Sequence, residues 1–95
     1  MDYVSKYELE NPNMYNPDTA EFIGSYDNGE SSSSFYYYTE HLYQNEEGEF
    51  FIVNYANNAD EQYQFMFPDY DELMEWAEKH LDVDTYVKYF GQVEE

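Results

Sequence analysis

Alternating apolar and polar residues predict β-strands through the middle of the chain. The segment from Phe35 to Tyr43 is rich in aromatic residues and predicts one strand, and the segment from Glu49 to Tyr55 predicts a second strand beside it. Between them, Asn45-Glu46-Glu47-Gly48 has the composition of a four-residue hairpin turn. After another turn, the segment from Glu61 to Phe67 predicts a third strand. Three successive strands joined by short turns predict an antiparallel meander.

The segment before these strands has a weaker pattern. Residues 1–17 are polar and rich in turn residues, which predicts an irregular N-terminal segment. The segment from Thr19 to Tyr26 predicts a short strand, and the alternative is one helical turn capped by Asn16 with Pro17 at its first position. The run Ser31–Ser34 has the composition of a flexible linker.

The hydrophobic period changes after Pro68. Apolar residues then recur at the spacing of an amphipathic helix, at Tyr70, Leu73, Met74, Ala77 and Leu81. Asp69 is the expected N-cap, and Glu72 completes a capping box three residues later. Trp76 lies at the edge of the apolar stripe, so we expect its ring to pack partly against the sheet.

A second, shorter helix is predicted from Val83 to Phe90. Its apolar stripe consists of Val83, Tyr86, Val87 and Phe90, and Gly91 ends it. Strands followed by helices predict an α+β fold, in which two C-terminal helices (69–91) pack on one face of a small meander of three to four strands (18–67). With 95 residues, the chain is expected to form a single domain.

The net charge says more about the function of the chain than any motif does. The chain holds 22 Asp and Glu residues against three Lys and no Arg, a net charge of −19. Nucleic acids and anionic membranes attract proteins through Lys and Arg, so direct binding to either is not expected. The absence of cysteine excludes disulfides and thiolate metal sites. Neither a signal peptide nor a membrane span is apparent, so we expect a cytoplasmic protein.

Carboxylates gather at two places in the predicted fold. One row lies opposite the apolar stripe of the first helix, and a second group lies at the hairpin turn. The residues that we expect to contact a partner are Asp71, Glu72, Glu75, Glu78, Asp82 and Asp84 in the helical region, and Glu46, Glu47 and Glu49 at the hairpin. A solvated helix face is the usual explanation of such a row, but ordinary surfaces mix both signs of charge. The persistent bias therefore favours a function, the imitation of closely spaced phosphates.

Two further groups of residues need an interpretation. The run Phe35-Tyr36-Tyr37-Tyr38, with Tyr43, Phe50, Phe51 and Tyr55, predicts either a tyrosine-rich binding face or rings that form the core and shield the sheet. His41 and His80 have no neighbouring nucleophile or metal-ligand pattern, so we expect no catalytic residue, metal or cofactor. Repulsion among the carboxylates is expected to raise the pKa of most of them, which would stabilise the fold toward pH 5.

Three segments resemble a family of small proteins carried on Firmicutes mobile elements. The matching residues are Tyr15, Thr19 and Ala20 near the N-terminus, Glu40, Leu42, Tyr43, Gly48 and Phe51 in the hairpin, and Trp76, Glu78, His80 and Leu81 in the first helix. The resemblance implies a mobile-element origin and an α+β fold. The chain departs from the family at its hairpin tip, where Glu46-Glu47 replaces the usual basic residues.

By size and acidity, the chain also resembles the DNA-mimicking anti-CRISPR and anti-restriction proteins of phages and plasmids. That resemblance implies a non-enzymatic inhibitor in the cytoplasm of a bacterial host, which occupies the nucleic-acid groove of a CRISPR effector first, or a restriction enzyme second. The alternative is an acidic adaptor or regulatory module for a basic protein partner of a mobile element. An enzyme is not expected, and the oligomeric state stays open.

Overall fold

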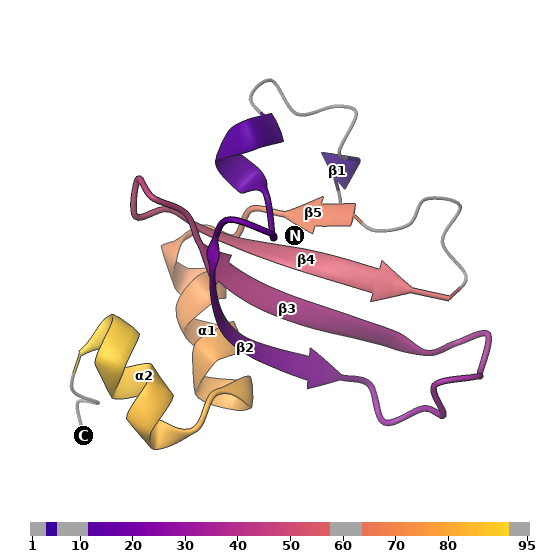
Figure 1. Cartoon of the computed structure of the whole chain (residues 1–95). Helices are drawn as coiled ribbons and strands as arrows, with labels where there is room; N and C mark the ends of the chain where they lie inside the picture. Colours follow the sequence, from indigo (N-terminus) through magenta and orange to yellow (C-terminus); the bar gives the residue numbers. More distant parts are fainter. Residues whose placement is uncertain (1–3, 6–11, 58–63, 92–95) are drawn as a thin grey trace.

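The computed structural model describes residues 4–5, 12–57 and 64–91. Its elements, in chain order, are β1 (Val4–Ser5), the 3-10 helix η2 (Pro12–Tyr15), β2 (Glu21–Asp27), β3 (Tyr38–Gln44), β4 (Phe50–Ala56), β5 (Gln64–Met66), α1 (Tyr70–His80) and α2 (Val83–Phe90) (Figure 1). Strands come first and helices follow, which confirms the predicted α+β class.

The strands form one antiparallel sheet in the order β1-β5-β4-β3-β2. From β2 to β5, successive strands are neighbours, so the predicted meander is confirmed. β1 was not expected, because residues 1–17 were predicted to be irregular. Its Val4 pairs with Phe65 of β5. A strand of two residues leaves no periodic pattern in the sequence, and it exists here because β5 offers it an open edge.

Two strands begin later than the sequence predicts. β3 begins at Tyr38, whereas the preceding Phe35–Tyr37 form a turn in which the Tyr37 N–H donates to the Ser34 carbonyl. The strand expected from Thr19 runs from Glu21 to Asp27, after a turn in which Asn16 accepts hydrogen bonds from the Thr19 and Ala20 N–H groups. The first residues of the third predicted strand, 61–63, lie outside the described residues.

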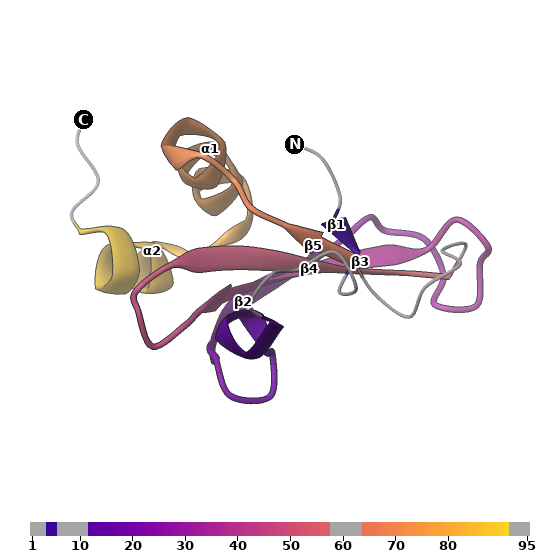
Figure 2. The same ribbon diagram turned by 90° about the horizontal axis from the view of Figure 1, so that it is seen from above.

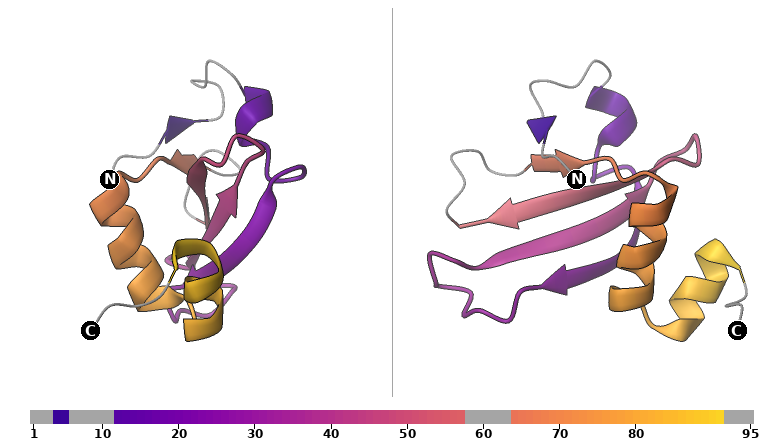
Figure 3. Two further views of the ribbon diagram at one scale, coloured as in Figure 1. Left: turned by 90° about the vertical axis from the view of Figure 1, so that its left-hand side faces the viewer. Right: turned by 180° about the vertical axis from the view of Figure 1, so that it is seen from behind.

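One face of the sheet carries the core beneath the helices. Leu42 and Ile52, both fully buried, pack with Met66 against Leu73 and Trp76 of α1. α1 crosses the strands on this face (Figure 3), and α2 extends the same core at the end of the sheet, where the Phe90 ring lies 5.1 Å from that of Phe50. Both C-terminal helices thus join the core as the sequence predicted, but the predicted apolar stripes are only partly buried, since Tyr70 of α1 and Val83 and Val87 of α2 are exposed.

The opposite face holds a second cluster of rings. Phe51, Tyr43 and Phe65 are buried there, and the Tyr15 ring covers Phe51 at a centroid distance of 5.6 Å. Figure 2 shows η2 on the side of the sheet opposite α1. Because both faces are covered at this point, successive residues of β4, such as Phe51 and Ile52, are both fully buried.

Candidate functional site

The acidic row, by which we mean Asp71, Glu75, Glu78 and Asp82, lies on the outer surface of the helical layer. All four side chains are exposed, while the buried residues of α1 are Leu73, Trp76 and Ala77. The helix forms here because Asp69 and Glu72 make a complete capping box, in which each side chain accepts a hydrogen bond from the other's backbone N–H. The amphipathic pattern therefore directs the acidic row into solvent.

Three of the helical carboxylates also serve the fold. Glu72 belongs to the capping box, and Glu75 forms an ion pair with Lys79 at 2.9 Å. Asp82 is the N-cap of α2 and accepts a hydrogen bond from the Thr85 N–H at 2.7 Å. Asp71 and Glu78 make no hydrogen bond or ion pair with any residue that the structure describes. These two side chains are thus the members of the row whose charge is open to a partner.

The pKa values of two carboxylates move in the direction opposite to our expectation. A hydrogen bond and ion pair with Lys79 lower the pKa of Glu75, and hydrogen bonds from Thr85 lower the pKa of Asp82. For these two groups, the predicted rise from mutual repulsion is wrong, because local donors outweigh distant like charges. Both carboxylates stay ionised well below neutral pH.

The hairpin tip, which comprises Asn45 to Glu49, forms the second group of carboxylates. Asn45 organises it, because its side-chain oxygen accepts hydrogen bonds from the backbone N–H groups of Glu47 and Glu49. Gly48 takes a φ of 85°, a conformation that a side chain would strain. Glu46, Glu47 and Glu49 are all exposed, as is Asp84 on the first turn of α2.

The acidic row and the hairpin tip lie toward opposite sides of the sheet. The tip bends away from α1 toward η2 (Figure 2). There the Asn45 side chain donates to the Met14 carbonyl at 3.0 Å, and the Tyr15 hydroxyl donates to Glu49 at 3.3 Å. Burial, and then the nearby Glu49 carboxylate, raise the pKa of Tyr15. The two groups therefore form separate surfaces, and one flat partner face does not cover both.

Positive charge is scarce beside these surfaces. Within residues 12–57 and 64–91, the basic side chains are Lys79, paired with Glu75, and Lys88, whose ammonium lies 5.2 Å from the centre of the Tyr89 ring. Of the carboxylates in the same residues, Glu40 and Glu72 are half-buried and all others are exposed. The described surface therefore presents almost uniformly negative charge to solvent.

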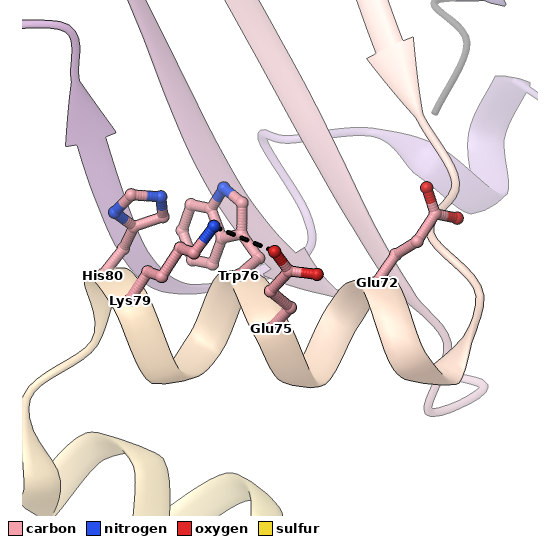
Figure 4. Close-up of a pocket in the computed structure, with 5 residues that line it drawn as sticks. All are labelled: Glu72, Glu75, Trp76, Lys79 and His80. Carbon is pink, nitrogen blue, oxygen red and sulfur yellow. Dashed lines mark hydrogen bonds and ion pairs between the residues drawn. The ribbon is translucent and has the colours of Figure 1, made fainter.

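A depression of about 250 Å³ lies along one flank of α1. It is lined by Glu72, Glu75, Trp76, Lys79 and His80, which project from the same side of the helix (Figure 4). Lys79 reaches Glu75 across it, and the buried Trp76 donates its indole N–H to Glu40 of β3 at 3.0 Å. Its principal polar groups are thus already paired within the chain, and we do not assign a ligand to it.

The histidines are packed against aromatic rings. His80 stacks on Tyr26 at a centroid distance of 4.0 Å, and His41 lies 5.0 Å from the Tyr55 ring. Burial lowers the pKa of both; for His80, the Glu40 carboxylate opposes this shift and Lys79 adds to it. Among the described residues, no group of three or more His, Asp or Glu side chains is placed to hold a metal ion.

Some of the aromatic residues lie in the core and others are exposed, so each of the two interpretations from the sequence fits part of them. Tyr43 and Phe51 belong to the core, as the shielding interpretation predicted. Phe35 and Tyr36 are exposed in the turn before β3, and Phe22 is half exposed on the sheet face opposite α1. Sequence reasoning missed the role of Glu40, although alternation along β3 places it on the same face as Leu42 and hence beneath Trp76.

Comparison with known proteins adds no relative. The chain matches no protein-family model, and neither a curated protein nor a solved structure matches it significantly. The resemblance to mobile-element proteins therefore stays a prediction from the sequence motifs. No helix among the described residues has the length and apolar character that a membrane span requires.

Proposed function

We propose that the protein is a non-enzymatic inhibitor that imitates nucleic acid and occupies the basic groove of a bacterial defence nuclease. A CRISPR effector is the first expected target, and a restriction enzyme is the second. The observation that carries this proposal is the exposure of nearly all described carboxylates while both described lysines are engaged within the chain. Such a surface destabilises the fold through self-repulsion. A functional role for the negative charge explains why the chain carries it despite this cost.

The spacing of the acidic row supports imitation of a phosphate backbone. The open carboxylates Asp71 and Glu78 lie about 10 Å apart along the helix axis at 1.5 Å per residue, and Glu75, which is paired with Lys79, stands between them. One strand of duplex DNA carries a charge about every 3.4 Å along its axis. The separation of the two open carboxylates is thus about three phosphate steps of one strand, so Arg and Lys side chains arranged for phosphates can pair with both of them.

Charge of this kind favours fast association. Complementary fields steer two proteins together and raise the association rate, an effect that falls as salt screens the charges. The inhibitor would thus compete with DNA or guide RNA by arriving at the same groove. An acidic adaptor would also bind a basic partner, but it would leave the nucleic-acid site free.

Competition tests this proposal. Labelled duplex DNA is bound to a CRISPR effector or restriction enzyme, the protein is added, and DNA release is followed by fluorescence anisotropy. We expect displacement of the DNA and a weaker effect as salt is raised from 50 to about 200 mM. A ternary complex of nuclease, DNA and protein would contradict imitation and favour the adaptor.

A further inference from the structure

The second helix leaves part of its apolar surface uncovered. The sequence predicts a stripe of Val83, Tyr86, Val87 and Phe90, yet α2 has no fully buried residue. Tyr86 and Phe90 are half-buried, whereas Val83 is 69% exposed and Val87 is 39% exposed. The packing of α2 on the core therefore uses one side of the stripe and leaves an aliphatic pair one turn apart in solvent.

A groove between α1 and α2 adjoins this aliphatic pair. It has a volume of about 270 Å³ and is lined by Ala77, Glu78, Leu81, Val83 and Tyr86. Four of its five lining residues carry largely apolar side chains. The interhelical groove is thus a concave apolar surface of the kind that accepts a single hydrophobic side chain.

The groove is held in place by contacts on both helices. The Tyr86 hydroxyl donates to the sulfur of Met74 on α1 at 3.8 Å, a weak link between its two walls. Leu81 packs directly over Gly24 of β2, where a larger residue would displace it. The Phe90 ring, packed on Phe50, fixes the far end of α2. A partner side chain would therefore enter a surface that is already formed, which lowers the entropic cost of binding.

Negative charge borders the interhelical groove. Glu78 lines it, and Asp82 and Asp84 stand on the connection and first turn beside Val83. The hydrogen bond from Thr85 lowers the pKa of Asp82, so this carboxylate is ionised at neutral pH. A second copy of the chain would bring a net charge of −19 against the same carboxylates. A basic partner complements the border, and a second copy does not.

We propose that the interhelical groove binds a segment of the target protein in which an aliphatic or aromatic side chain stands beside Lys or Arg. This inference rests on the proposed function and names the apolar anchor of the same interface. Exposed charges steer the encounter, while a buried side chain at the centre of an interface supplies most of the lasting affinity. Glu78 belongs to both the groove and the acidic row, so one partner segment contacts both.

Two synthetic peptides of equal positive charge test the proposal without a nuclease. One is a helical Lys/Leu peptide, and the other replaces every Leu by Ser. Each is titrated into the isotopically labelled protein and followed by NMR. We expect the Leu peptide to shift the amides of Ala77, Leu81, Val83 and Tyr86 and to bind about tenfold tighter, because partial burial of one Leu gives an effect of this size.

Substitutions in the chain provide the controls. The double variant Val83→Ser/Val87→Ser should remove the preference for Leu, and Val83→Ser alone, at the more exposed position, should reduce it if the double variant unfolds. Phe35→Ser removes a ring that is 65% exposed in the turn before β3 and should keep the preference.

Equal affinity for both peptides, or shifts confined to the acidic row, would overturn the groove assignment. Concentration-dependent dimers that the double serine variant abolishes would assign the groove to a second copy and also overturn it. Failure of the proposed function looks different: the Leu preference would persist while DNA stays on every nuclease tested.

Discussion

Trp76 offers the sharpest test of how the helical layer is held to the sheet. Its ring is 6% exposed and packs with Leu42, Ile52 and Leu73, and its indole N–H donates to Glu40 at 3.0 Å. Replacing a buried Trp by Ala costs about 3–5 kcal/mol, against a total of about 5–15 kcal/mol for a domain of this size. We therefore expect Trp76→Ala to lose a large part of its stability and to unfold at a clearly lower urea concentration than the wild type.

The variant Trp76→Phe separates packing from the hydrogen bond. It keeps most of the apolar contact but removes the donor to Glu40. A hydrogen bond to a charged group is worth about 1.5–3 kcal/mol, and water can replace part of it because Glu40 is half-buried, so we expect a cost of about 1–2 kcal/mol. Glu40→Gln keeps an acceptor for the indole and should cost less than Glu40→Ala.

Urea unfolding followed by far-ultraviolet circular dichroism measures these changes, since the Trp fluorescence is lost in the variants. A double-mutant cycle of Trp76→Phe and Glu40→Ala should give a coupling energy of about 1 kcal/mol. The reasoning is refuted if Trp76→Ala unfolds at nearly the wild-type urea concentration, because α1 would then not depend on this ring.

Three further predictions concern stability. The lowered pKa values of His41 and His80 mean that the unfolded state binds these protons first, so the two histidines contribute a loss of stability as pH drops from 7 through the usual His range, opposite in sign to the gain expected from carboxylate repulsion, and His80→Gln should remove its share of that loss in pH-dependent melting curves. Added NaCl should raise the melting temperature at pH 7.5, because it screens the excess negative charge; a decrease would mean that the repulsion is already compensated. Gly24→Val should cost about 1–3 kcal/mol in urea unfolding, because its side chain displaces Leu81, whereas Gly24→Ser should cost less.

The parts of the fold that local patterns specify were predictable from the sequence. α1 follows from its apolar spacing and from the Asp69 and Glu72 capping signal, both of which the structure confirms. The hairpin follows from two residues of its turn. The side chain of Asn45 accepts hydrogen bonds within the turn, and Gly48 takes the positive φ that the turn requires. In such elements, the residues that determine the structure lie within one or two turns of one another.

The parts that depend on distant partners were not predictable. β1 depends on an edge that β5 supplies from the other end of the chain. Phe35 and Tyr36 have high strand propensity, but they lie in a turn. The pairing of β3 with its neighbours β2 and β4 begins only at Tyr38, so these two residues have no strand beside them. Likewise, the sequence places Val83 in an apolar stripe but does not show that the core ends before it.

The same distinction between local patterns and distant contacts applies to the candidate site. Exposure of the acidic row follows from helical periodicity alone. Its internal partners also follow from local spacing, because Glu75 and Lys79 stand at i and i+4 on one helix, and Asp82 followed by Thr85 is a recognisable N-cap arrangement at the start of the second helix. Separation of the hairpin tip from the acidic row depends on how the tip bends toward η2, which no local pattern specifies.

Charge reversal at the two open carboxylates of the acidic row tests the central claim most directly. The variant Asp71→Lys/Glu78→Lys leaves the caps and the Glu75–Lys79 pair intact. Its matched control, Asp18→Lys/Glu30→Lys, makes the same change in net charge at exposed positions that belong neither to the acidic row nor to the hairpin tip. Both proteins enter the DNA-competition assay with a nuclease that the wild type inhibits.

We predict that the helix variant loses inhibition by at least about 100-fold, because each reversal sets a cation against the basic groove at a cost of more than about 1.4 kcal/mol. Its melting temperature should hold or rise, and the control should lose far less inhibition. Full inhibition by the helix variant, or an equal loss in the control, would contradict imitation of phosphates by this row.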